Sequence, residues 1–186
     1  MEEVIIAIIA LVAVAAIAVA AWLWMDRRKG AQLRDRFGEE EYRRVRTREG
    51  GRRQADAELE RRQKRVENYD IRPLTHSQYD HYSDRWRTVQ SAFVDSPTSS
   101  VHEADDLVAE VMNARGYPME DFDERAADLS VDHASVVQNY CRAHAIAVSD
   151  RRGEASTEDL RQAFVHYRAL FDKLLVSTEQ HQEVSR

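Results

Sequence analysis

Cys141 and His144 are the residues whose types and spacing come nearest to reactive chemistry. They lie three positions apart in a segment with helical periodicity, directly after Tyr140. Residues at this spacing share one helix face, so a thiolate and an imidazole could meet there as a nucleophile and its base. A reactive thiolate needs an exposed, electropositive setting, but both residues fall on an apolar stripe in an acidic segment. The pattern therefore favours a core histidine over a catalytic one.

A small-ligand or metal site among the helices is the alternative, and its candidate residues are Tyr140, Cys141, His144 and Tyr167. A single cysteine excludes a multi-cysteine zinc site. The acidic runs lack the glycine-centred loop of a calcium site and are expected to be solvated surface; they are Glu103, Asp105, Asp106 and Glu110, and Glu120, Asp121, Asp123 and Glu124. No phosphate-binding glycine loop or nucleophile elbow is present. We therefore predict no catalytic residue, no metal and no cofactor, and a protein that is not an enzyme.

The segment that must position these side chains, residues 73–176, has the periodicity of an acidic antiparallel bundle of about four helices. Capping boxes open its first and last helices, at Thr75-x-x-Gln78 and Ser156-x-x-Asp159. No run of the chain alternates with period two, so the predicted fold class is all-α.

Between the capping boxes the sequence predicts three further helical segments. One carries the apolar stripe from Val101 to Met112, a short one runs from about Met119 to Leu129, and Asp132 is expected to cap the third. The tail, residues 177–186, is polar and expected to fray.

The amino-terminal segment has no charged residue, glycine or proline from Val4 to Met25. About 20 apolar residues suffice for a helix to cross a bilayer. A positive flank follows at once, and two tryptophans stand where headgroups would meet the helix; these expected membrane-interface residues are Trp22, Trp24, Arg27, Arg28 and Lys29. Residues 1–26 are therefore predicted to be a single-pass transmembrane anchor in the cell membrane. The amino terminus is expected outside and the carboxy-terminal domain in the cytoplasm.

A cleaved signal peptide is the competing interpretation, because Ala18-Val19-Ala20 has the small residues of a cleavage site. The protein would then be secreted or extracytoplasmic. Glu2 and Glu3 in place of a positive start, and an apolar run longer than a signal peptide needs, favour the anchor.

Residues 27–72 are rich in arginine and are predicted to form a basic juxtamembrane helical stem, although the chain as a whole carries a net charge of −6. Arg52 to Tyr69 is rich in alanine, glutamate, arginine and glutamine, which are good helix formers. Its apolar stripe is thin and interrupted by Arg62; the stripe comprises Ala55, Leu59, Val66 and Tyr69. A stripe this thin predicts an exposed helix or a short coiled coil.

Several longer motifs carry a resemblance to a known family. They are IRPL (71–74), RWRTVQSAFVD (85–95), RGYP (115–118), RAADLSVDH (125–133) and RGEASTEDLRQAFVHYRALFD (152–172). In these the chain resembles a family of uncharacterised bacterial proteins with one amino-terminal hydrophobic segment and a helical carboxy-terminal region. The resemblance implies this architecture and assigns no activity, cofactor or site residue.

Together these patterns favour a non-catalytic protein-interaction or scaffold module on the cytoplasmic face of the membrane. The expected partners are the lipid bilayer and another protein, and a homo-oligomer is compatible with the sequence. Nucleic acid is not an expected partner, because no aromatic stacking platform accompanies the arginines of the stem.

Overall fold

The computed structural model describes residues 2–119 and 121–176, apart from the side chains of residues 2–10, 12, 13, 23, 26, 27 and 29. Within these ranges the chain is all-α, as predicted, with helices and no strands. The helices are α1 (Glu2–Glu49), α2 (Arg52–Glu67), α3 (His76–Ala92), α4 (Pro97–Ala114), α5 (Phe122–Asp132), α6 (Ala134–Arg151) and α7 (Thr157–Val176). The predicted frayed tail, residues 177–186, lies outside the described residues.

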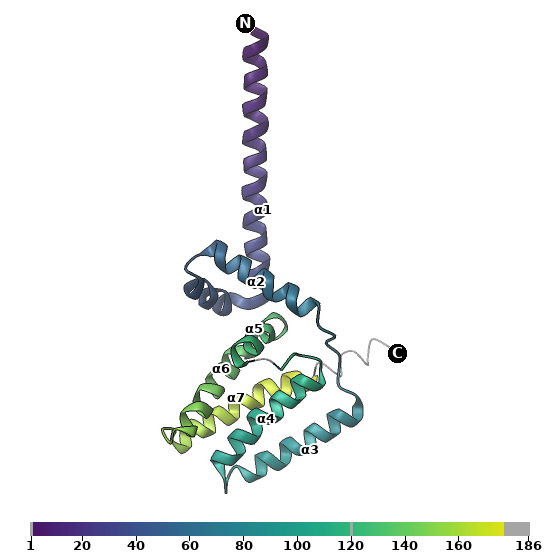
Figure 1. Cartoon of the computed structure of the whole chain (residues 1–186), viewed down its shortest axis with the longest axis vertical. Coiled ribbons are helices and arrows are strands. Elements are labelled where there is room, and N and C mark those ends of the chain that lie inside the picture. Colours follow the sequence, from purple (N-terminus) through teal and green to yellow (C-terminus); the bar gives the residue numbers. More distant parts are fainter. Residues whose placement is uncertain (1, 120, 177–186) are drawn as a thin grey trace. The chain divides into compact units, whose positions relative to one another are not determined.

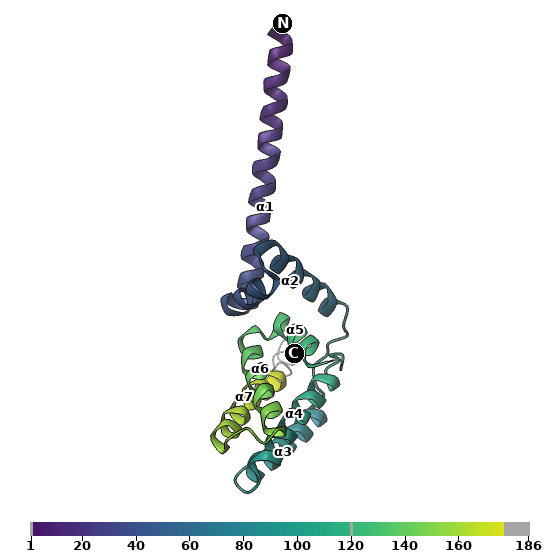
Figure 2. The same ribbon diagram turned by 60° about the vertical axis from the view of Figure 1, so that its left-hand side comes forward.

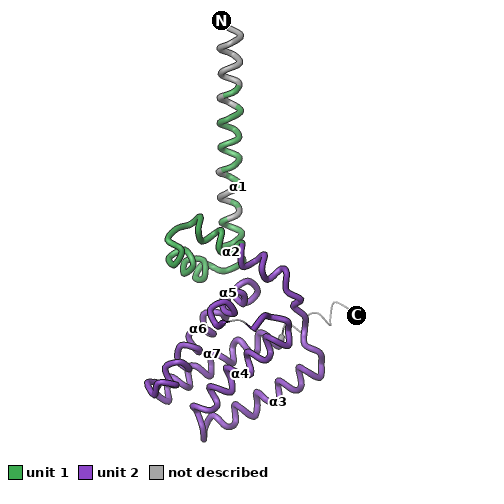
Figure 3. The backbone as a smooth tube through the Cα atoms, in the orientation of Figure 1, with its two compact units in different colours: residues 1–60 green, residues 61–186 purple. Residues whose placement is uncertain are grey.

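The chain divides into two compact units, residues 1–60 and residues 61–186 (Figure 3). The division falls inside α2, so that its first half belongs to unit 1 and its second half to unit 2.

Unit 1 is built on the long helix α1. This helix bends at Gly38, whose φ of 76° and ψ of 154° are open to glycine and strained for other residues. After the bend the chain continues to Glu49, turns, and enters α2. The Tyr42 hydroxyl donates a hydrogen bond to Asp56 Oδ1 at 2.7 Å. The side chains buried in this unit include Leu33, Phe37, Tyr42, Val45, Ala55 and Leu59.

Unit 2 is a helical bundle, as the sequence predicts. Helix α4 packs against α3, α6 and α7, while α6 also packs against α5 and α7 (Figures 1 and 2). Aromatic stacking joins α3 to α7, because the Trp86 ring lies 5.1 Å from that of Phe164 and 4.5 Å from that of Phe171, measured between centroids. Helix α5 packs on α6 and adds Ala126 and Leu129 to the same hydrophobic core.

Local helix signals account for most of the boundaries in unit 2. The Thr75 hydroxyl accepts a hydrogen bond from the Gln78 amide, and the reciprocal bond is also present. The Ser156 hydroxyl likewise accepts from the Asp159 amide at 3.2 Å. Both predicted capping boxes are therefore confirmed.

The region between α5 and α6 differs from the prediction. Helix α5 begins at Phe122 and continues to Asp132. Asp132 therefore ends one helix and does not cap the next. The residue before α6 is His133, whose side chain makes no capping hydrogen bond. The aspartate at the N-cap of α5 is Asp121, which accepts from the Glu124 amide at 2.9 Å.

The prediction of a transmembrane anchor over residues 1–26 is wrong. Among the described residues, no helix combines the length and the apolar character that crossing a bilayer requires. Spanning takes about 20 consecutive apolar residues, whereas the described side chains of this run are Leu11, Val14 to Trp22, Trp24 and Met25. The part of the run from Val4 to Ala10 lies outside the described side chains. The predicted location depended on this anchor. A single-pass protein in the cell membrane with a cytoplasmic carboxy-terminal domain is therefore not supported either.

The expectation of an exposed helix over Arg52 to Tyr69 is also wrong. Ala55 and Leu59 are fully buried, and Val66 is 6% exposed. Arg62, which interrupts the stripe in the sequence, is itself 1% exposed, and its Nη1 donates to Ser130 Oγ at 3.4 Å. Ala55 and Leu59 are thus buried within unit 1, whereas Arg62 is buried within unit 2, where the Ser130 hydroxyl receives its guanidinium.

Candidate functional site

A polar cluster lies where α4, α5, α6 and α7 meet. His144 Nδ1 of α6 lies 3.5 Å from Asp105 Oδ2 of α4. The Phe122 ring, at the start of α5, stacks on the imidazole with a centroid separation of 3.7 Å and an interplanar angle of 9°. Phe122 also packs against Tyr140 at 4.9 Å, and Tyr140 meets the Tyr167 ring edge-on at 6.3 Å. Four helices thus supply one side chain or more to the same cluster.

The cluster is largely shielded from water. The side chains of His144 and Asp105 are 22% and 18% exposed, while Tyr140 and Tyr167 are fully buried. Burial on its own would raise the pKa of Asp105, but His144, Tyr167 and Arg125 outweigh it and lower that pKa below the usual value. Burial raises the pKa of both tyrosines, so both remain protonated. At neutral pH the carboxylate is therefore the charged member among these three groups.

Several polar atoms of the cluster have no hydrogen-bond partner. They are the hydroxyl groups of Tyr140 and Tyr167, Nε of Arg125 and Nδ1 of His144. The Tyr167 hydroxyl is near enough to Asp105 to influence its pKa, but the geometry is not that of a hydrogen bond. The His144–Asp105 separation exceeds the range of about 2.7 to 3.2 Å of a good hydrogen bond. The buried polar groups of the cluster are thus incompletely satisfied by hydrogen bonds.

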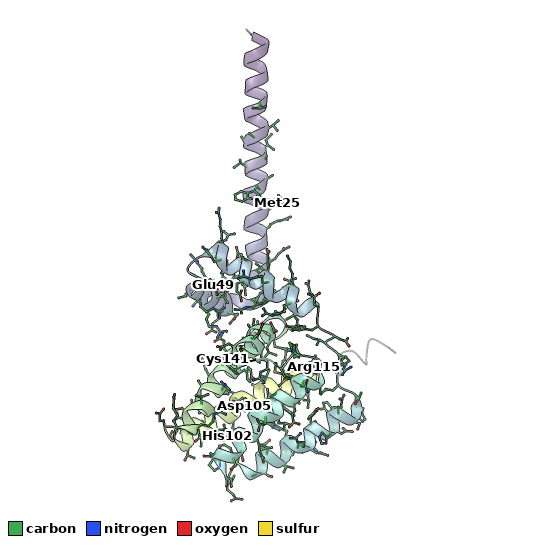
Figure 4. The ribbon with its side chains drawn as sticks, in the orientation of Figure 1. Met25, Glu49, His102, Asp105, Arg115 and Cys141 are labelled. Carbon is green, nitrogen blue, oxygen red and sulfur yellow. The ribbon has the colours of Figure 1, made fainter. Side chains whose placement is uncertain are left out.

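Three of the four candidate residues from the sequence, Tyr140, His144 and Tyr167, meet in this cluster. The fourth candidate, Cys141, is half-buried on α6, the helix that also carries Tyr140 and His144. Figure 4 labels Cys141 and Asp105. Over the described residues, no group of three or more histidine, cysteine, aspartate or glutamate side chains is placed to hold a metal ion.

Two members of the cluster were missed in the sequence, Asp105 and Phe122. The acidic run around Asp105 predicts solvated surface, yet the Asp105 carboxylate faces His144. The signal that could have found it is its spacing, four residues after Val101 and three before Val108, which puts it beside the buried stripe of α4. The signal that could have found Phe122 is likewise its spacing, four residues before Ala126 and seven before Leu129 on one face of α5.

A second imidazole–carboxylate pair joins α4 and α6 elsewhere. His102 Nε2 lies 3.1 Å from Asp150 Oδ2, and the Thr98 hydroxyl lies 3.5 Å from Asp150 Oδ1. No ring stacks on His102 among the described aromatic contacts. This pair therefore provides a natural comparison for His144 and Asp105.

An exposed apolar surface lies on α1, and we call it the arm. Its large apolar side chains are between 52% and 73% exposed; they are Leu11, Val14, Ile17, Val19, Trp22, Trp24 and Met25. The Arg28 guanidinium lies 4.1 Å from the centroid of the Trp24 ring, and that of Arg53 lies 5.8 Å from Trp22. The side chains of Arg27 and Lys29 lie outside the described residues. The membrane-interface role predicted for these residues depended on the anchor.

Comparison of the chain with models of protein families, with curated proteins and with solved structures finds no match. The resemblance noted in the sequence therefore stays a prediction.

Proposed function

We propose that this protein is a non-catalytic protein-interaction module that assembles with further copies of itself through the arm on α1. The observation that carries the proposal is the exposure of seven large apolar side chains along one helix. Contiguous exposed apolar surface of this kind marks interaction sites, because leaving it in water costs free energy.

The distribution of these side chains around the helix bears on how many neighbours the arm needs. At 100° per residue, the seven positions from Leu11 to Met25 spread over more than half of the helix circumference. An ordinary amphipathic helix presents a stripe of about 100° to one neighbouring surface. A single partner helix would leave part of the arm exposed, so we infer that more than two arms pack together.

A second copy is the partner that the arm fits best by charge and by shape. The described side chains from Leu11 to Met25 are all uncharged, so arms placed side by side meet no like-charge repulsion. Small exposed residues stand between the large ones and allow close approach of helices; they are Ala15, Ala16, Ala18, Ala20 and Ala21.

The test is the mass of the protein in solution, measured by light scattering after size exclusion. We expect the full chain to be an oligomer and the variant Val14→Glu/Ile17→Glu to be a monomer, because buried unpaired carboxylates oppose association. Val94→Glu is the matched control: Val94 is 86% exposed and lies outside the arm. This variant should remain oligomeric.

Two results would overturn the proposal. One is a full chain that is monomeric at micromolar concentration, including a monomer that instead sediments with phosphatidylcholine vesicles. The other is an oligomer whose mass does not change in the Val14→Glu/Ile17→Glu variant.

A further inference from the structure

We propose that α5 is a proton-sensitive lid, held closed over the His144–Asp105 pair most firmly when the imidazole carries a charge. The proposal concerns unit 2 alone and is independent of the arm. The lid is the first half of α5, and Phe122 is the residue that closes it.

The lid contacts the rest of unit 2 through the imidazole ring of His144. Phe122 is the first residue of α5, and its ring covers one face of His144 at 3.7 Å, almost parallel to it. On the ring edge, Nδ1 points to Asp105 at 3.5 Å. One side chain therefore contacts both the lid and a carboxylate on α4.

Protonation strengthens both contacts at the same time. A charged imidazole attracts the carboxylate and converts a long contact into a charge-assisted hydrogen bond. It also attracts the face of the phenyl ring as a cation, within the separation of about 6 Å over which this interaction acts. With the neutral imidazole, Nδ1 has no hydrogen-bond partner and the stacking is between uncharged rings.

Other ionisable groups face the pair from each neighbouring helix. Arg125 of α5 acts on Asp105, as does Tyr167 of α7. Tyr140 and Cys141 lie beside His144 on α6, and Arg151 of the same helix acts on Tyr167. Arg125 attracts the Asp105 carboxylate and helps to keep it charged. Burial raises the pKa of both tyrosines, so neither tyrosine changes its charge over the pH range of the test.

Hydrogen exchange of the full chain, corrected for intrinsic exchange rates, measures the lid directly. Exchange from a closed helix reports the free energy of its local opening. We expect protection of the amides of the first half of α5 to increase by about threefold to tenfold between pH 8 and pH 5.5, in keeping with a partly exposed charged contact.

Three variants distinguish local opening of the lid from a change in the stability of the whole unit. His144→Gln, which cannot be charged, should abolish the pH dependence in α5, and Phe122→Leu should reduce it. His102→Gln removes the comparison pair with Asp150 and should leave the response of α5 intact. Equal protection of α5 at both pH values in the unmodified chain would overturn the proposal, even if a variant fails to fold. So would a response that survives in His144→Gln or disappears in His102→Gln.

Discussion

Arg65 holds Asp128 through two hydrogen bonds to the same oxygen. Its Nε and Nη2 lie 2.8 and 2.5 Å from Asp128 Oδ1, and the Tyr69 hydroxyl donates to Oδ2 at 2.8 Å. The Asp128 side chain is 2% exposed, whereas that of Arg65 is 34% exposed. These contacts join the end of α2, which belongs to unit 2, to α5. The Asp128 contacts hold the second half of α5. The first half carries Phe122, and its Glu124 Oε1 lies 3.7 Å from Arg65 Nη1.

Replacing the Asp128 carboxylate tests how much its contacts with Arg65 and Tyr69 stabilise the fold. Asp128→Asn removes the charge from a buried acceptor of three hydrogen bonds and should lower the free energy of unfolding by about 2 kcal/mol. Chemical denaturation followed by circular dichroism, at fixed protein concentration, measures the change. Glu158→Gln is the control, because the pair of Glu158 with Arg161 is exposed on both sides. It should leave stability unchanged, and equal effects of the two variants would contradict this account of the Asp128 contacts.

His133 predicts a loss of stability in mild acid. Burial, with help from Arg115 and Lys173, lowers the pKa of His133 to about 4. An unfolded histidine binds its proton near pH 6.5, so between these values the unfolded state holds more protons than the folded state. Stability is therefore complete above pH 6.5 and falls as the pH decreases toward 4, by about 2 to 3 kcal/mol.

The variant His133→Phe isolates this contribution. Neither ring nitrogen of His133 has a hydrogen-bond partner, so a phenyl ring loses no bond. We expect the variant to flatten the decline between pH 6.5 and pH 4 without a loss of stability at pH 7.5. Thermal unfolding at a series of pH values measures this dependence. If the stability of the variant declines as steeply as that of the unmodified chain, His133 is not the cause of the decline.

Gly116 is required by both its conformation and its surroundings. Its φ is +93°, and a Cβ atom at this position would lie 2.2 Å from the carbonyl oxygen of Asp70. Gly116→Ala should therefore cost about 3 kcal/mol of stability, combining backbone strain with displacement of the Asp70 segment. Gly153 has a similar φ of +72° but nothing within 4 Å of the added atom. Gly153→Ala should cost only about 1 kcal/mol, and equal costs in denaturation would refute the role of the close approach.

Local signals made the fold of unit 2 predictable. The side chains of Thr75 and Ser156 satisfy amides of their own helices, so their effect can be foreseen from residues three positions away. The start of α5 carries a signal of the same kind, which the prediction overlooked, because the Asp121 carboxylate accepts from the Glu124 amide three positions on. Asp121 caps it where Met119 had been expected to open the helix, and Asp132 belongs to its last turn.

The missed features depend on contacts between distant residues. Arg62 is buried because Ser130 receives its guanidinium, and Asp105 is shielded because His144 and Tyr167 face it from other helices. Neither partner can be identified from the spacing within one helix. The anchor was predicted from the composition of the run Val4 to Met25, and the described helices do not support it. In each case a pattern within one segment was assigned to the most common environment for that pattern.

The contact between arms is tested most directly by disulfide trapping. The native thiol is removed by Cys141→Ser, and a single new thiol is placed on the arm by Ile17→Cys, with Val94→Cys in the same background as the control. Assembly through the arm predicts rapid formation of covalent dimers on mild oxidation of Ile17→Cys and little from Val94→Cys. Equal trapping at the two positions, or none at Ile17→Cys, would contradict it.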